Sequence, residues 1–234
     1  MLAKLQASKG SEYDVVICSD YIIEVMGKQK NILMQPIDKS KVPNYKNVDP
    51  QFLNQPYDKG NRYSIPYTLG SQMIVYNSEK VNFPIKSYKD LWNPALKNSL
   101  VLVDDPRIII GMTLKKLGYS MNETDPKKLA QAKQELLKLK PNVKVLDADT
   151  PHNSLINGDT TVGFMYGSQA SAAVKSNPKF KIVYPEEGMN AEEDNFIIPS
   201  KAPHKENAEK FINFMLDGKI SNEATTANEY INTN

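Results

Sequence analysis

The stretch Tyr63-Ser-Ile-Pro-Tyr-Thr-Leu-Gly-Ser-Gln-Met-Ile-Val-Tyr-Asn77 is rich in residues that favour β-strands, yet it contains Pro66 and Gly70. Proline cannot donate a backbone N–H to a β-ladder, and glycine weakens the interior of a strand. A β-rich run that contains both residues indicates a strand that leaves one sheet and enters another. We therefore expect the chain to cross between two lobes here, and a cleft between lobes is a usual place for a ligand.

Composition narrows the function classes. The chain has 234 residues, enough for one large domain or two small ones, and its 40% hydrophobic share is ordinary for a protein with a buried core. A net charge of +2 argues against a nucleic-acid or membrane-surface partner. Only Arg62 and Arg107 among the 29 basic residues are arginines, which is a poor supply for bidentate recognition of phosphate. The single cysteine, Cys18, lies in an apolar run and is expected to be a buried small side chain.

Short apolar runs alternate with amphipathic segments, and this pattern predicts an α/β fold. Residues 15–18 form a continuous apolar run, and residues 99–103 are apolar after Ser99; both are typical of strands buried on both faces in a parallel sheet. The first run leads into Ser19-Asp20-Tyr21 and the second into Asp104-Asp105, and a helical segment follows each. In open α/β sheets the carboxyl ends of the strands face the ligand crevice. We therefore expect these polar residues at a binding edge.

The residues expected at that edge are acidic and aromatic. They are Ser19, Asp20, Tyr21, Asp104, Asp105, Tyr166, Glu192, Glu193 and Asp194, with Tyr67 near the crossing and Tyr230 near the end. Carboxylates pair with ammonium groups, and ring faces attract cations, so this set favours an organic cation over an anion. Structural explanations stay open: the paired aspartates suit a helix cap, the run 192–194 suits a solvated loop, and the tyrosines suit half-buried structural positions.

No catalytic or metal-binding pattern accompanies these residues. The sequence has no glycine-rich phosphate loop, no G-x-S-x-G elbow and no H-E-x-x-H motif. His152 and His204 are far apart and do not have metal-ligand spacing. We expect a protein that is not an enzyme and that needs neither a cofactor nor a metal; a small α/β enzyme is the less favoured alternative.

Several segments, in order along the chain, resemble one known family, the spermidine/putrescine-binding proteins of polyamine ABC transporters. The segments are Tyr13-Asp-Val-Val-Ile, Ser19-Asp-Tyr21, Ile37-Asp-Lys-Ser40, Tyr63-Ser-Ile-Pro-Tyr67, Leu117-Gly-Tyr-Ser120, Lys140-Pro-Asn-Val143, Asn195-Phe-Ile-Ile-Pro199, Lys210-Phe-Ile-Asn-Phe214 and Glu229-Tyr-Ile-Asn-Thr-Asn234. The resemblance covers essentially the whole chain.

The resemblance implies a two-lobed periplasmic-binding-protein fold of type II, in which each lobe is a mostly parallel sheet flanked by helices. Lobe one would comprise residues 1–69 and 194–234, and lobe two would comprise residues 70–193. It also implies an extracytoplasmic, non-enzymatic, monomeric protein that captures a polyamine between its lobes and then docks on the membrane permease of an ABC importer. An export signal is not part of this expectation, because none is visible in the sequence.

The resemblance assigns ligand-binding roles to individual positions. Ser19, Tyr21, Asp105, Tyr166, Asp194 and Tyr230 match pocket positions of the family. Two positions depart from it: Ile108 stands where spermidine binders have a glutamate, and Glu192 stands where they have a tryptophan. Glu192 is therefore included among the expected ligand residues. Because one acid is lost and another is gained, a different organic cation or amine remains an alternative to spermidine or putrescine.

The chain begins in what reads as the middle of a helix and ends without a stop signal. Compared with the family it lacks an initial strand with its aromatic loop, and it lacks C-terminal helices. We therefore expect a fold that is incomplete at both termini. A truncated form without binding activity is a further alternative.

Overall fold

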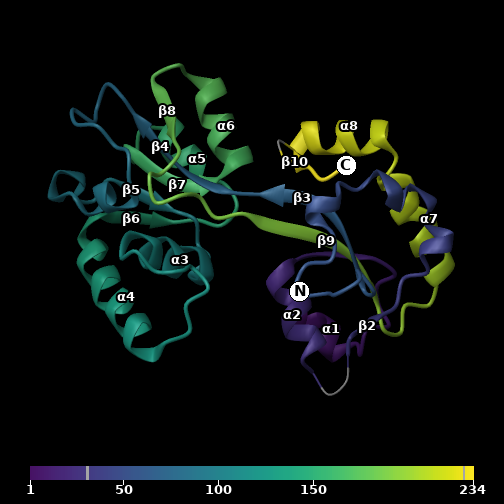
Figure 1. The fold of residues 1–234 in the computed structure, drawn as a ribbon. Coiled ribbons are helices and arrows are strands. Elements are labelled where there is room, and N and C mark those ends of the chain that lie inside the picture. The colour runs from purple at the N-terminus through teal and green to yellow at the C-terminus, as the bar shows by residue number, and fades with distance from the viewer. Residues whose placement is uncertain (30–31, 229) are drawn as a thin grey trace. The chain divides into compact units, whose positions relative to one another are not determined.

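The structure is a computed structural model that describes residues 1–29, 32–228 and 230–234. The chain forms two compact units (Figure 1). Unit one comprises Met1–Gly70 and Glu192–Asn234, and unit two comprises Ser71–Ala191. The chain therefore passes from one unit to the other twice, once after Gly70 and once after Ala191.

The sheet of unit one is built around β9 (Glu192–Pro199). The strand order is β1 (Val16–Ser19), β9, β3 (Ser64–Gly70) and β10 (Ile231–Asn232), and the short β2 (Met34–Gln35) also pairs with β9. Every recorded pair is antiparallel, so the expectation of a mostly parallel sheet is wrong for this unit. The reason lies in the connection: the chain leaves on β3 and returns on β9, so these two strands run in opposite directions and pair.

The apolar run at residues 15–18 forms β1, but the strand is not buried on both faces as expected. Ile17 is 47% exposed, whereas Cys18 is buried, because β1 lies at one end of the described strand order. The apolar run therefore predicted the strand correctly, but it predicted burial on both faces, which is wrong.

The proline in the crossing stretch lies at an irregularity in the sheet. Pro66 pairs with Asn195 and Thr68 with Asp194, so Tyr67 is the extra residue of a bulge. A bulge accommodates a residue that has no N–H to donate. Gly70 then pairs with Glu192 at the last register position before the chain enters unit two. Within unit two, the Ser71 hydroxyl donates to the carbonyl of Asn190 at 2.6 Å.

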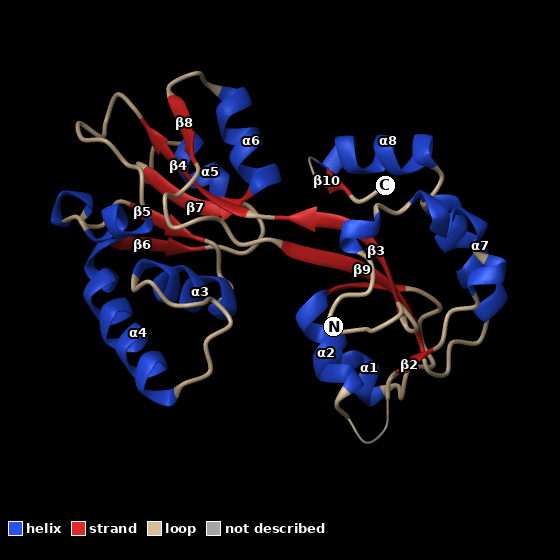
Figure 2. Ribbon diagram, viewed as in Figure 1, coloured by secondary structure: helices blue, strands red, loops and turns tan. Residues whose placement is uncertain are grey.

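Helices pack on both faces of the unit-one sheet (Figure 2). Alternate side chains of β9 point to opposite faces, so Ile197 joins a core with α1 (Leu2–Ala7) and α2 (Asp20–Gly27). Phe196 and Ile198 join a second core with α7 (Lys205–Met215). The unit also contains α8 (Gly218–Asn228) and the 3₁₀ helices η1 (Lys39–Lys41), η2 (Pro43–Asn47) and η3 (Pro50–Phe52).

Unit two contains a mixed sheet. The strand order is β6 (Val143–Leu146), β5 (Leu100–Leu102), β7 (Val162–Tyr166), β4 (Gln72–Asn77) and β8 (Phe180–Val183). The first three strands are parallel, as expected, and β4 and β8 pair antiparallel. The expected parallel arrangement is thus correct for half of this sheet.

Two helical layers cover the unit-two sheet. One core lies under α3 (Pro106–Lys116), with α4 (Pro126–Leu139) packed outside it, and includes the 3₁₀ helix η4 (Tyr88–Trp92). The other lies under α5 (Pro151–Ile156) and α6 (Gly167–Ser176) (Figure 2). The remaining 3₁₀ helices are η5 (Pro94–Leu96) and η6 (Lys140–Asn142). Pro106 and Pro126 each lie in the first turn of a helix, where a missing N–H costs no intrahelical bond.

Candidate functional site

The centre of the candidate site in unit one is a serine–aspartate pair. Ser19 ends β1 with an extended backbone, and its hydroxyl donates a 2.8 Å hydrogen bond to Oδ1 of Asp194. The two residues are register partners, so both side chains project from the same face of the sheet. Burial raises the pKa of Asp194, and the bond from Ser19 opposes part of that rise. The carboxylate is therefore held in place but poorly solvated, and a cation would relieve that cost.

The strand pairing that places Ser19 opposite Asp194 continues with polar residues on the next two strands of the sheet. Thr68 on β3 pairs with Asp194, and Asn232 on β10 pairs with Thr68. Thr68 is buried, and Asn232 accepts a 2.7 Å hydrogen bond from the hydroxyl of Ser221 on α8. A line of polar side chains therefore crosses this end of unit one, fixed at both ends by hydrogen bonds.

Tyr230 lies beside this row, directly before β10. Burial raises the pKa of its phenol, and the nearby charge of Asp194 adds to the rise. A Cβ placed on Gly70 would lie 3.7 Å from Cε1 of Tyr230, so the ring rests against the backbone at the crossing. Tyr230 as a whole remains 38% exposed. An exposed ring face next to a carboxylate suits an organic cation.

Two further predicted residues lie at the same end of unit one. Glu192 is half-buried and pairs with Gly70, two residues before Asp194 on β9 and therefore on the same face. Tyr21 is half-buried in the first turn of α2, where its backbone N–H donates to Oδ1 of Asp20 at 2.7 Å. Unit one thus brings together Ser19, Asp194, Glu192 and Tyr230 around one sheet end, with Tyr21 two residues beyond Ser19.

The opposite face of β9 carries an acid that the sequence reasoning did not include among the ligand residues. Glu193 is 7% exposed, and its Oε1 accepts a hydrogen bond from the hydroxyl of Tyr57. Its position between Glu192 and Asp194 on a strand was the available signal, because alternate residues of a strand face opposite sides.

In unit two, Asp105 caps α3. Its Oδ1 accepts hydrogen bonds from the backbone N–H groups of Arg107 at 2.8 Å and Ile108 at 3.3 Å. The structural explanation, a helix cap, is therefore correct for Asp105, and a ligand role would add to it. Asp104 is exposed. Ile108, the position of the expected glutamate, is buried in the core under α3.

Tyr166 shares an edge of the unit-two sheet with Asp105. It is the last residue of β7, it is half-buried, and it packs against the core under α3. Strands β5 and β7 are parallel with Leu102 opposite Phe164, so Asp105 and Tyr166 lie near the ends of neighbouring strands. The third parallel strand ends at the same edge with Asp147, whose backbone N–H donates to Leu102 and which sequence reasoning missed. Its carboxylate accepts from the N–H groups of Asp149 and Thr150, a turn that an Asp-x-Asp-Thr pattern suggests.

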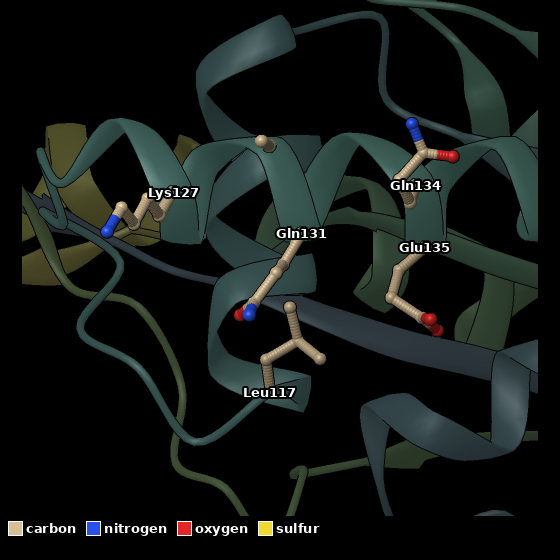
Figure 3. A pocket seen from close by; sticks show the side chains of 6 residues that line it. Leu117, Lys127, Gln131, Gln134 and Glu135 are labelled. Atoms are coloured by element: carbon tan, nitrogen blue, oxygen red, sulfur yellow. The ribbon is translucent and has the colours of Figure 1, made fainter.

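A surface pocket of about 440 Å³ lies elsewhere in unit two, between the residue that follows α3 and one side of α4 (Figure 3). Its lining is Leu117, Lys127, Ala130, Gln131, Gln134 and Glu135. None of the predicted ligand residues contributes to it. The one carboxylate, on Glu135, already pairs with Lys116 and Lys138, and no aromatic ring lines the pocket. This pocket therefore lacks the chemistry of a cation site.

The described residues contain no group of three or more histidine, cysteine, aspartate and glutamate side chains placed to hold a metal ion. Within those same residues, no helix has the length and apolar character needed to cross a membrane. The cysteine is buried, which raises the pKa of its thiol to about 12, so it is not a ready thiolate. The arrangement offers carboxylates and ring faces for binding.

Two α/β units joined by two crossing segments are the architecture of two-lobed solute-binding proteins. Residues 1–234 match the family of bacterial extracellular solute-binding proteins, and the chain belongs to this family.

Known relatives narrow the comparison. The chain is 42% identical over 224 residues to the spermidine/putrescine-binding periplasmic protein of Salmonella typhimurium, a match that covers 95% of this chain and 64% of the relative. A solved structure of the spermidine/putrescine ABC transporter substrate-binding protein PotD from Streptococcus pneumoniae is 35% identical, with a TM-score of 0.83 over 100% of this chain and 72% of that one. A structure described as a putative spermidine/putrescine ABC transporter from Listeria monocytogenes is 33% identical. Its TM-score is 0.92, and the match covers 100% of this chain and 72% of that one. The chain thus spans less than two thirds of the length of the Salmonella relative.

Proposed function

We propose that this chain belongs to the solute-binding component of an ABC importer and captures polyamines such as spermidine or putrescine. Family membership supports a binding role, and the similarity to spermidine/putrescine-binding relatives supports this ligand class. The proposal includes no chemical step. The protein holds a cationic solute and releases it unchanged.

The observation that carries the ligand class is the environment of Asp194. A carboxylate whose burial raises its pKa, held by Ser19 and lying near the ring of Tyr230, favours a ligand with a positive charge and an alkyl chain. Asp105 and Tyr166 offer a second acid and ring in unit two. Two acids suit a diamine, because each ammonium group of a polyamine needs a carboxylate partner. We assign Tyr21 and Glu192 to the same ligand.

A titration of thermal unfolding tests the ligand class directly. Putrescine, spermidine and spermine are added to the full chain, with arginine and phosphate as controls. A ligand that binds only the native state raises the melting temperature in a saturable manner. We expect a saturable rise with at least one polyamine and none with phosphate. A cooperative unfolding transition that none of the three polyamines shifts would contradict the proposal.

A second candidate is another organic amine. It rests on Ile108, which is buried in the core where spermidine binders have a glutamate, and on Glu192, which adds an acid to unit one. A saturable shift with arginine, together with none for putrescine, spermidine or spermine, would favour it. The loss of the acid at position 108 removes a carboxylate partner for a terminal ammonium group, which is why a different amine is considered.

The proposal also covers location and partners. We infer an extracytoplasmic protein that docks, as a monomer and without nucleic acid, on a membrane permease. The family name and the periplasmic relatives support this inference. Co-purification of the full-length transporter with this chain, in the presence and absence of polyamine, tests the docking step.

A further inference from the structure

Glu193 is a buried acid whose neighbours are unusual for a carboxylate. It lies on β9 opposite Leu69, on the face of the sheet away from Asp194, and is 7% exposed. The hydroxyl of Tyr57 donates to its Oε1. Buried carboxylates are normally paired with a cation. Among the described residues, the recorded hydrogen bonds and charge interactions of Glu193 involve Tyr57, Asn195 and Asp20, and none of these is a cation.

The hydroxyl of Tyr57 has two acceptors within reach and one proton to donate. Oε1 of Glu193 is the nearer acceptor, and Oδ1 of Asn195 lies 3.3 Å away. When Glu193 is ionised, Tyr57 donates to it. When Glu193 is protonated, its own O–H can donate to the Tyr57 oxygen while Tyr57 turns its proton to Asn195. The Tyr57 hydroxyl therefore has a hydrogen-bonding partner in both protonation states of Glu193, and its proton goes to Asn195 only when Glu193 is protonated.

The titratable groups around Glu193, Tyr57 and Asn195 are mostly acidic. The charge of Asp20, at the start of α2, acts on Glu193. Cys18 on β1 is the register partner of Asn195, and its thiol is neutral because burial raises its pKa to about 12. On the strand itself, Glu192 and Asp194 lie on the opposite face. Tyr57 also lines a surface pocket of about 360 Å³, whose charged residues are Glu24, Lys28, Asp58, Lys59 and Arg62. That pocket gives the Tyr57 side chain contact with solvent, whereas Glu193 does not line it.

The balance of these effects raises the pKa of Glu193. Burial is the largest cause, and the charge of Asp20 acts in the same direction. The hydrogen bond from Tyr57 acts in the opposite direction, because it stabilises the ionised form. Asp20 directly follows Ser19, so a positive charge that binds at the Ser19–Asp194 pair beside Asp20 would also stabilise the ionised form of Glu193.

We propose that Glu193 is a positioning residue that couples the binding of a cationic ligand at the Ser19–Asp194 pair to the release of one proton, with Tyr57 as its hydrogen-bonding partner. The inference rests on the proposed function, because it requires a cation at this end of unit one. In molecules whose Glu193 is protonated before the ligand binds, the release step transfers that proton to water. The hydroxyl of Tyr57 then turns from Asn195 to the new carboxylate, and the positive charge of the ligand replaces the lost proton.

The test is the pH dependence of affinity for putrescine and spermidine, measured by calorimetry on the full chain between about pH 5 and about pH 8. Linkage limits the coupling of one proton to at most about a tenfold change in affinity per pH unit. We expect wild-type affinity to weaken as the pH falls. Glu193→Gln keeps an acceptor for Tyr57 but cannot titrate, so the affinity of this variant should change less with pH than that of wild type. The pH dependence that remains in the variant is due to Asp194.

Tyr57→Phe gives the decisive comparison. It removes the bond that lowers the pKa of Glu193, so the midpoint of the affinity profile should move to higher pH. A purely structural Glu193 would not produce this shift. Glu209→Gln is the matched control, because Glu209 is also buried in unit one but accepts from the backbone of Asp38 and pairs with Lys205. Its profile should match wild type.

The outcomes separate the two proposals. Binding with the same slope in wild type and Glu193→Gln, or no upward shift in Tyr57→Phe, overturns the coupling and leaves polyamine capture standing. No binding of either amine at any pH overturns both. A carboxyl NMR titration of the ligand-free protein, assigned with Glu193→Gln, must also show the Glu193 midpoint moving upward in Tyr57→Phe. An unmoved midpoint contradicts the role of Tyr57.

Discussion

Ser19 Oγ lies 2.8 Å from Asp194 Oδ1, although the two residues are 175 positions apart in the sequence. The pairing of β1 with β9 brings them together, because Ser19 and Asp194 are register partners at the last position of β1. A residue from the first strand thus orients an acid on the strand that returns from unit two. The proposed ligand group therefore depends on one antiparallel pair of strands.

Ser19→Ala should weaken polyamine binding by roughly tenfold, since hydrogen bonds to charged groups contribute about 1.5–3 kcal/mol and the ligand can recover part of this. The loss should be larger at low pH. Ser19 lowers the pKa of Asp194, so the variant raises that pKa and protonates the acid at a higher pH. Calorimetric titration at two pH values measures both effects.

Ser40→Ala provides the control for this variant. Ser40 also donates to an aspartate, with its hydroxyl 2.7 Å from Oδ1 of Asp38, but this pair is exposed and does not belong to the proposed ligand group. Its affinity should equal that of wild type at both pH values. Equal affinity of Ser19→Ala and wild type would show that the ligand does not depend on the orientation of Asp194.

The two proposed roles of Asp105 can be separated by two substitutions. Asp105→Ala removes the cap of α3 and should lower the free energy of unfolding by about 0.5–2 kcal/mol. Asp105→Asn keeps a capping oxygen, so its stability should remain within a few tenths of a kcal/mol of wild type, about the difference among good caps. Its affinity for a polyamine should fall, because the ammonium group loses its carboxylate partner.

Chemical denaturation and calorimetry on both variants provide the measurement. If Asp105→Asn binds as tightly as wild type while Asp105→Ala is destabilised, Asp105 is a cap and nothing more. That result would support the structural explanation alone, which the position of Asp105 before a helix already suggested.

How much of this site follows from the sequence differs between the units. In unit two, a strand followed by an acid and a helix predicted the environment of Asp105 well, because parallel strands place their ends at one edge and local patterns are enough. In unit one, the same pattern at Ser19 predicted the polar end of β1 but not its partner. That partner depends on which strand returns beside β1, and no local periodicity reports the pairing of distant strands.

The direction of the unit-one strands illustrates the same limit. An apolar run is compatible with parallel and with antiparallel pairing, and the exposed face of Ile17 shows that it does not report burial at a sheet edge. The burial of Glu193 did not follow from the sequence for a related reason. A run of three acids suggests a solvated loop, whereas in a strand the middle one turns to the other face. Treating residues 192–194 as strand would have separated Glu193 from its neighbours.

The stability of the ligand-free protein should depend on Asp194 in an uncommon direction. The folded-state pKa of this acid is raised above its ordinary value of 3.8, so the native state holds the proton more tightly than the unfolded state. The free energy of unfolding therefore falls as pH rises from the unfolded pKa through the folded one. Asp194→Asn removes this cost and keeps an acceptor for Ser19, so the variant should be at least as stable as wild type at neutral pH.

Denaturant unfolding at several pH values tests this sign. The advantage of Asp194→Asn should shrink toward zero as the pH falls below 3.8, where the carboxyl is neutral in both states. A variant that is less stable than wild type at neutral pH, with the deficit vanishing in acid, would mean that the ionised carboxylate stabilises the fold. Asp194 would then have a structural role rather than a strained binding role.

The contact between α3 and α4 should show the opposite pH dependence, since its acid has a lowered pKa. Lys116 Nζ contacts the carboxylate of Glu135 and lies 4.5 Å from the ring centroid of Trp92, whose Nε1 donates to the Glu135 carbonyl. The Lys116 and Glu135 side chains are only 14% and 17% exposed. Lys116→Met should therefore cost roughly 1–2 kcal/mol, between an exposed and a fully buried pair.

The matched control is Lys138→Met, because Lys138 pairs with the same carboxylate but is 68% exposed, and it should change stability by less than about 0.5 kcal/mol. The pH dependence follows from Glu135, whose pKa is lowered from 4.5 chiefly by Lys116 and then by Lys138. The stability that the pair contributes is complete above the unfolded value and is lost as pH falls through the folded one. The difference between wild type and Lys116→Met should therefore narrow in acid. A constant difference across the pH range would assign the cost to lost packing against Trp92 instead of to the ion pair.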